Sequence, residues 1–161
     1  MKPLITLLAV SDTHGNTPCL CDLVDQIGPV ADLIIHAGDG ESDCDLLLGW
    51  CDQPIIRVAG NGDRLSSAPR IQELTLSGQR ILICHGDQFA VKQGLDRLVR
   101  FAQTENFQLV IYGHTHQAAV TVHEGVTLVN PGTLALDNPR HSYALITISQ
   151  EAINATILPI S

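Results

Sequence analysis

Two pairs of side chains with metal-binding chemistry occur at close spacing, each directly behind an apolar run. In GHTH, which follows LVIY, His114 and His116 flank a single threonine. In SDTHG, which follows LITLLAV, Asp12 and His14 are separated in the same way. On a tight turn, two side chains at positions i and i+2 reach neighbouring coordination positions. The Asp-x-His and His-x-His spacings therefore suit a metal site.

Three further apolar runs end in residues of the same kinds. Asp39 follows DLIIHA, Asn61 and Asp63 follow PIIRVA, and His85 follows RILIC. In open α/β sheets the ligand crevice lies beyond the carboxyl ends of the strands. We therefore expect side chains from five strands to converge on one crevice, with glycines that allow sharp turns and close backbone approach.

The candidate ligands are carboxylates, imidazoles and one amide, without a thiolate. This set suits Mn²⁺, Fe or Zn²⁺. It is too large for one tetrahedral ion with an open position, and it suits two ions about 3.5–4 Å apart that share a carboxylate. Taken alone, several of these residues would be turn residues, helix caps or hydrogen-bonded histidines. The candidates are Asp12, His14, Asp39, Asn61, His85, His114 and His116.

The elements that must position these residues follow from the apolar runs and turn signals. Helices are expected at about Thr17 to Ile27, Asp43 to Trp50 and Val91 to Gln103, with a hairpin at Ser77-Gly78-Gln79. In the first half, apolar runs alternate with helices and predict parallel βαβ units. In the second half, short runs separated by Gly, Pro and Asn predict antiparallel strands. The result is an α/β fold of two packed sheets with helices outside.

Length and composition narrow the classes of function. A chain of 161 residues is expected to form one domain, residues 1–161, and 45% of it is hydrophobic. The net charge of −8 disfavours nucleic-acid binding. Five cysteines without a CxxC pair indicate reduced thiols and a cytoplasmic location. The apolar run LITLLAV is too short to span a membrane and is expected to be a buried strand.

The motifs DTH, GD, GNGD, H and GHTH, in this order, resemble those of the calcineurin-like metallophosphoesterase superfamily. NPGT, residues 130–133, is similar to the N-P-G-S of its small bacterial phosphodiesterase branch. The resemblance implies a four-layer αββα sandwich of two mixed sheets and two divalent ions, with manganese preferred and iron, nickel or zinc as alternatives. It assigns one ion to Asp12, His14, Asp39 and His116, and the other to Asp39, Asn61, His85 and His114.

By the same resemblance, the chain is a phosphodiesterase in which a metal-bridging hydroxide attacks a small phosphate ester. Many members of the superfamily carry a histidine at the third position of G-N-x-D/E, where this chain has Gly62. That departure leaves the general acid unassigned and favours diesters whose leaving group needs little protonation. Asp63 is expected to orient the site rather than to act as an acid.

Two other classes of function compete with catalysis. The retromer subunit with this fold serves as a protein-binding scaffold, and this chain would resemble it functionally if its metal site were inactive. A metallo-β-lactamase-type hydrolase would need H-x-H-x-D-H, whereas QAAV follows His116. Edge strands in the second half leave room for a homo-oligomer. Of the remaining histidines, we expect His36 to be packed in a strand and His123 and His141 to be exposed. The arginines Arg57, Arg64 and Arg70 are expected on a solvated face.

Overall fold

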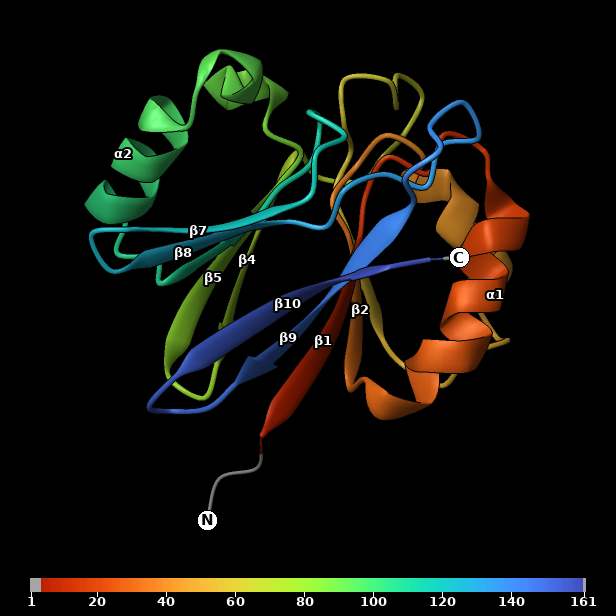
Figure 1. The fold of residues 1–161 in the computed structure, drawn as a ribbon, viewed down its shortest axis with the longest axis horizontal. Helices are drawn as coiled ribbons and strands as arrows, with labels where there is room; N and C mark the ends of the chain where they lie inside the picture. Colours follow the sequence, from red (N-terminus) through yellow and green to blue (C-terminus); the bar gives the residue numbers. More distant parts are fainter. Residues whose placement is uncertain (1–3, 161) are drawn as a thin grey trace.

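The computed structural model describes residues 4–160 and contains two stacked five-stranded sheets with helices on their outer faces. Figure 1 shows four layers, with α2 (Asp96–Thr104) on one outer face and α1 (Thr17–Ile27) on the other. The αββα arrangement predicted from the sequence is confirmed.

The first sheet has the strand order β10-β9-β1-β2-β3, and the second has the order β4-β5-β6-β8-β7. The strands of the first sheet are β1 (Ile5–Val10), β2 (Leu33–His36), β3 (Ile55–Arg57), β9 (Ser142–Ile148) and β10 (Ile153–Pro159). Those of the second are β4 (Ile71–Leu76), β5 (Gln79–Cys84), β6 (Leu109–Ile111), β7 (Ala119–His123) and β8 (Val126–Asn130). Short 3₁₀ helices are η1 (Gly28–Val30), η2 (Glu41–Leu47), η3 (Asp87–Phe89) and η4 (Val91–Gln93).

Both sheets are mixed, so the expected change from parallel to antiparallel pairing halfway along the chain is confirmed only in part. In the second half, β5, β6 and β8 pair in parallel, while β4 and β7 are antiparallel edges. Strands β9 and β10 return to the first sheet, where they pair antiparallel beside β1. Local apolar patterning marks where strands lie, but it does not specify which sheet a late strand joins.

Strand alternation explains why the predicted strands are almost continuously apolar. Successive side chains of a strand point to opposite faces of its sheet. In β1, Leu7 and Ala9 enter the core between the sheets, whereas Leu8 and Val10 pack in the core beneath α1. Strands β5 and β6 repeat this pattern between the intersheet core and the core beneath α2. Because both faces are covered, polar alternation is absent and the runs are apolar throughout.

The predicted helix over 91–103 is interrupted in the structure. It begins as the single turn η4, stops at Gly94, and resumes as α2 from Asp96. Gly94 has φ of 136°, which only glycine adopts without strain and which no α-helix contains. The predicted helix over 43–50 is the 3₁₀ helix η2, which begins two residues earlier. The helix at Thr17 is confirmed, with Pro18 in its first turn.

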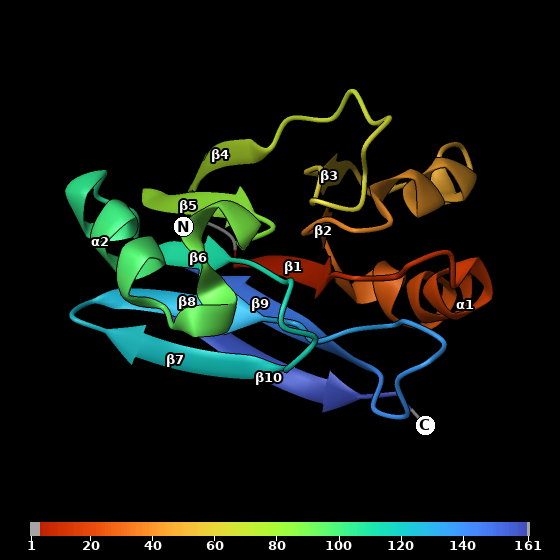
Figure 2. The same ribbon diagram turned by 90° about the horizontal axis from the view of Figure 1, so that it is seen from above.

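The loops that carry the candidate ligands gather at one end of the sandwich. Seen from above in Figure 2, the chain leaves β1, β2 and β6 toward a common region beside the end of β1. In the first sheet β1 pairs in parallel with β2 and β2 with β3, and in the second sheet β5 pairs in parallel with β6, so the carboxyl ends within each sheet point the same way. The sheets thereby bring together residues that are up to 104 positions apart.

Candidate metal centre

Six of the seven predicted residues converge in two groups of three. Asp12, His14 and His116 form one group, and Asp39, His85 and His114 form the other; in each group the three candidate ligand atoms lie within 4.8 Å of one another. Two pairs of ring nitrogens face each other. His14 Nε2 is 3.3 Å from His116 Nε2, and His114 Nδ1 is 3.2 Å from His85 Nε2. Such spacing suits nitrogens that share an ion.

The carboxylates of Asp12 and Asp39 lie between the two groups. Asp12 Oδ1 is 3.2 Å from His116 Nε2 and 3.7 Å from His85 Nε2. Asp39 Oδ2 is 3.3 Å from His85 Nε2 and 3.8 Å from His14 Nε2. Each carboxylate thus contacts histidines of both groups, which is the placement that a shared carboxylate requires.

One oxygen of this centre lacks a protein partner. Asp12 is fully buried, and its Oδ1 accepts no hydrogen bond within the described residues. Its Oδ2, by contrast, accepts from the Ser11 hydroxyl at 2.6 Å and from the His114 N–H at 3.0 Å. A buried carboxylate oxygen without a partner is costly in a folded protein. A cation facing Oδ1 would satisfy it, so the residues present fit a metal ion.

The orientation of the His85 ring is fixed by the backbone. His85 Nδ1–H donates to the carbonyl oxygen of Ala37 at 2.8 Å, and His85 is almost fully buried. This hydrogen bond places the lone pair on Nε2, which faces both carboxylates. A backbone carbonyl that fixes the tautomer of a histidine is a common feature around metal-binding imidazoles.

Burial and nearby charges have opposite effects on the pKa values of Asp39 and His85. Burial alone would raise the pKa of Asp39, but the His85 ring and the Gly62 N–H outweigh it and lower the pKa to about 2. Burial alone would lower the pKa of His85, but Asp39 and Asp12 outweigh it and raise the pKa. The pKa of His114 is lowered, first by burial and then by the charge of His85. The metal-free centre therefore attracts a proton to His85, and a divalent cation would compete with that proton.

Left-handed backbone conformations concentrate at this centre. Nine non-glycine residues between 4 and 160 have positive φ, and five of them are candidate ligands. Such conformations cost free energy and persist where the surroundings impose them, often at functional sites. The five candidate ligands are Asp12 (φ 55°), His14 (44°), Asp39 (59°), His114 (75°) and His116 (61°).

Glycine at position 113 is explained by close packing. A Cβ there would lie 2.0 Å from Ser11 Oγ and 2.6 Å from Asp12 Oδ2. Only glycine lets the loop after β6 approach the loop after β1 this closely. The G of GHTH is thus required by contact with the Asp12 carboxylate rather than by its own φ.

Asn61, the seventh predicted residue, lies in the loop after β3 and is exposed. Its two neighbours contact the centre directly. Gly62 N–H donates to Asp39 Oδ1 at 2.7 Å, and a Cβ on Gly60 would lie 2.2 Å from the same oxygen. The backbone on both sides of Asn61 therefore packs against the Asp39 carboxylate.

Asp63 fixes the loops after β2 and β3 to each other, as predicted for an orienting residue. Its carboxylate accepts three backbone N–H groups, those of Asp39, Gly40 and Gly60, each at 2.8 Å. Charge-assisted hydrogen bonds of this kind are about twice as strong as neutral ones. Asp63 therefore positions the backbone of Asp39 without touching the centre through its own side chain.

Replacing Asp63 with alanine is expected to leave three N–H groups without their acceptor. We expect the free energy of unfolding of the metal-free protein to fall by about 2 kcal/mol, and metal affinity to fall by about 10- to 100-fold. Urea denaturation and metal titration measure the two effects. Asp22→Ala, at an exposed position of α1, is the matched control. Unchanged metal affinity in Asp63→Ala would contradict the orienting role.

A hydrogen-bonded relay that the sequence analysis did not find holds the Asp12–His14 turn. Gly38 N–H donates to His36 Nδ1 at 3.0 Å, so His36 Nε2–H must donate to Thr13 Oγ1 at 2.9 Å. The Thr13 hydroxyl then donates to Asp43 Oδ2 at 2.5 Å. His36 is buried, as predicted, but it also links β2 to the loop after β1. The only sequence signal was a threonine between two candidate ligands.

The NPGT segment, residues 130–133, is a turn that forms hydrogen bonds to two loops of the centre. Asn130 Nδ2 donates to Gly113 O at 3.2 Å and to Thr115 Oγ1 at 2.9 Å, which holds the loop after β6. The Thr133 hydroxyl donates to the Asp12 carbonyl at 2.8 Å. The motif therefore acts on the two loops that carry the Asp-x-His and His-x-His pairs.

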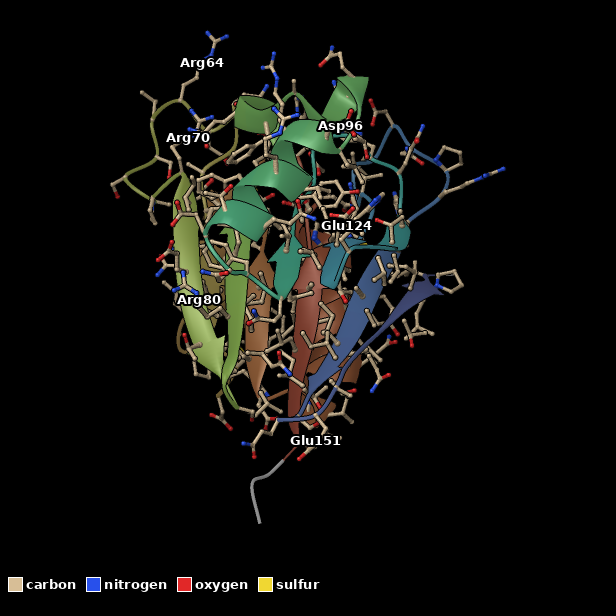
Figure 3. The ribbon with its side chains drawn as sticks, turned by 90° about the vertical axis from the view of Figure 1, so that its left-hand side faces the viewer. Arg64, Arg70, Arg80, Asp96, Glu124 and Glu151 are labelled. Atoms are coloured by element: carbon tan, nitrogen blue, oxygen red, sulfur yellow. The ribbon has the colours of Figure 1, made fainter. Side chains whose placement is uncertain are left out.

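The remaining predicted side chains lie outside the centre. His123 is exposed as expected, but His141 is half-buried and its Nε2–H donates to Ala135 O at 2.7 Å. Arg57 pairs with Glu41 and Asp45, and Arg70 pairs with Asp87. Arg64 is exposed, and in Figure 3 it extends outward at the end of the molecule opposite Glu151.

A four-layer αββα fold with two candidate metal-binding groups at its strand ends is the architecture of a metal-dependent hydrolase. The sequence matches the calcineurin-like phosphoesterase superfamily domain over residues 5–151, and the chain belongs to this superfamily. A Bacillus subtilis protein named probable metallophosphoesterase is 29% identical over 150 residues, which cover 92% of this chain and 87% of the relative.

Solved structures show the same fold. A conserved uncharacterized protein from Streptococcus pneumoniae, described as a predicted phosphoesterase, superposes with a TM-score of 0.84 at 24% identity. The match covers 99% of this chain and 91% of that one. An archaeal phosphodiesterase superposes with a TM-score of 0.76 at 17% identity, over 96% of this chain and all of the other. Within residues 4–160, no helix combines the length and apolar character needed to span a bilayer.

Proposed function

We propose that this protein is a two-metal phosphodiesterase. The observation that carries the proposal is the pair of buried carboxylates between two pairs of facing imidazoles, with Asp12 Oδ1 left without a protein partner. One ion would be held by Asp12, His14, Asp39 and His116. The other would be held by Asp39, Asn61, His85 and His114.

Manganese is the resident ion that we propose, because carboxylate, imidazole and amide ligands suit it; iron, nickel and zinc fit the same donor set. When bound, two divalent ions hold phosphate oxygens and lower the pKa of water. All five cysteines are free, which supports a reducing cytoplasmic setting. We also infer that residues 1–161 work as one domain on a small phosphate ester.

The chain's own residues favour a diester over an alkyl monoester. A Cβ added at Gly62 would lie 3.1–3.4 Å from the Asp39 carboxylate. Gly62 itself has no side chain that could protonate a leaving group. Asp63, the nearest carboxylate on the same loop, has both oxygens engaged by backbone N–H groups. An ester whose leaving group needs little protonation is therefore the substrate that this centre suits.

The test is hydrolysis of bis(p-nitrophenyl) phosphate by chelator-treated protein, before and after Mn²⁺ is added back. We expect no turnover in the metal-free protein, turnover with Mn²⁺, and loss of that turnover in His114→Ala. His123→Ala, which removes an exposed histidine on β7, should keep it. Absence of turnover with Mn²⁺, Ni²⁺, Fe²⁺ and Zn²⁺ alike would refute the proposal and favour the scaffold class.

A further inference from the structure

Two pockets flank the metal centre, one on each side. Pocket A, of about 760 Å³, lies between η2 and the loop joining β3 to β4; pocket B, of about 650 Å³, lies between the loop after β6, the loop joining β8 to β9, and the end of β10. Residues that line pocket A include Glu41, Asp45, Arg57, Arg64, Ser66 and Ser67. Residues that line pocket B include His116, Ala118, Asn138, Arg140, Ile157 and Ile160. Both volumes lie within the range of small-molecule sites.

Each pocket is lined by one residue that contacts the centre. Gly62 lines pocket A, and its N–H donates to Asp39 Oδ1 at 2.7 Å. His116 lines pocket B, and its Nε2 is 3.2 Å from Asp12 Oδ1. In Figure 2, the loop joining β3 to β4 and the loop joining β8 to β9 lie on opposite sides of the end of β1. A phosphate at the centre would therefore have a pocket on either side.

Pocket A is lined mainly by polar side chains, and the Arg57 guanidinium in it is paired. Arg57 Nε lies 3.3 Å from Glu41 Oε2, and Arg57 Nη1 lies 2.7 Å from Asp45 Oδ1. The Ser66 hydroxyl donates to Glu41 Oε1 at 2.5 Å. Because three carboxylates line this pocket beside two guanidinium groups, and two of those carboxylates engage Arg57, the pocket does not favour an anion. Its hydroxyl, carboxylate and guanidinium groups suit an uncharged group that carries hydroxyls.

Pocket B has no carboxylate among its lining residues, and its lining is slightly more apolar than that of pocket A. Ile157, Pro159 and Ile160 give it an apolar wall, and Arg140 is exposed at its side with no carboxylate among the lining residues. Apolar surface gains free energy when a ligand removes it from water, and an arginine plane packs well on flat ligand groups. This pocket suits a group with an apolar face.

We propose that the substrate is an asymmetric phosphodiester, with a hydroxyl-bearing group in pocket A and an apolar-faced group in pocket B. The inference rests on the proposed function, because it places the phosphate at the metal centre. A monoester fills one pocket and leaves the other to water, whereas a diester with two unlike groups fills both. Apart from His116, the residues that set substrate preference thus lie outside the candidate ligand set.

The test blocks each pocket separately with a tryptophan at an exposed position. Ser67→Trp fills pocket A, and Ala118→Trp fills pocket B. Glu151→Trp is the matched control, because Glu151 is exposed at the opposite end of the molecule from Arg64 (Figure 3). The probes are phenylphosphonate, 2,3-dihydroxypropylphosphonate and methylphosphonate, whose P–C bonds resist hydrolysis. Calorimetry on the Mn²⁺-loaded protein gives the dissociation constants.

We expect a crossed result. Ala118→Trp should weaken phenylphosphonate by about tenfold, and Ser67→Trp should weaken 2,3-dihydroxypropylphosphonate by about tenfold. Methylphosphonate should bind all variants within about twofold of the unmodified protein, which shows that the centre and fold are intact. Both blocking variants should also raise KM for diester hydrolysis, while Glu151→Trp leaves it unchanged.

Two outcomes would overturn the inference. One is that both blocking variants match Glu151→Trp with every probe; the other is that they weaken all three probes equally. Failure of the proposed activity is distinguishable from either. A crossed binding result without turnover would refute the phosphodiesterase activity while supporting the two pockets. Metal-dependent turnover without the crossed result would support the activity and refute the pockets.

Discussion

Replacing Asp39 with asparagine is expected to reduce metal-dependent diester hydrolysis by about 1000-fold or more, and to lower bound metal to less than one ion per chain. Residues that only orient metal ligands already cost about 10- to 100-fold when replaced, and Asp39 contacts histidines of both groups. If asparagine keeps its oxygen for the Gly62 N–H, it places an NH₂ group opposite His85. The negative charge between the two proposed ions is lost.

Metal content by mass spectrometry and turnover of bis(p-nitrophenyl) phosphate measure the two effects. Asp25→Asn, which makes the same chemical change at an exposed position of α1, controls for the loss of one negative charge from the chain. Two tightly bound ions together with unchanged turnover in Asp39→Asn would contradict a ligand role for Asp39. Full metal loading with lost turnover would instead confine Asp39 to the chemical step.

The convergence of the candidate ligands was predictable because these residues obey a simple positional rule. Each candidate ligand directly follows an apolar run, and parallel strands bring their carboxyl ends to one edge of a sheet. The sequence therefore identified Asp12 and Asp39 before any pairing was known, and the structure places their carboxylates among the same histidines. The family motifs added the ligand partition, which position alone left open.

What the sequence did not predict depends on contacts between distant segments. The His36–Thr13–Asp43 relay joins β2, the loop after β1 and η2, and no local pattern distinguishes it from ordinary packing. Likewise, β9 and β10 return to the first sheet, and their apolar patterns do not show which of the two sheets they join. The helix break at Gly94 could have been predicted, since glycine weakens a helix, but the amphipathic pattern continues on both sides of it.

The relay predicts acid sensitivity of the fold that is independent of metal. Complete burial lowers the pKa of His36 from 6.5 to about 4, although nearby carboxylates partly oppose this. In the unfolded chain His36 therefore binds a proton below pH 6.5, whereas in the folded chain it binds one only below about pH 4. Stability is fully present above pH 6.5 and falls as pH decreases through this window. At about 1.4 kcal/mol for each tenfold change in proton affinity, the loss is about 3 kcal/mol.

Urea denaturation in the presence of chelator, at pH 7.5 and pH 4, measures this loss without interference from bound metal. The comparison is with His36→Gln, whose amide can accept from the Gly38 N–H and donate to Thr13 but does not titrate. His14 and His85, whose pKa values are raised, contribute with the opposite sign in both proteins and cancel in the difference. We expect the unmodified protein to lose about 3 kcal/mol more than His36→Gln over this range. Equal losses in the two proteins would contradict the prediction, because they would show that protonation of His36 does not destabilise the fold.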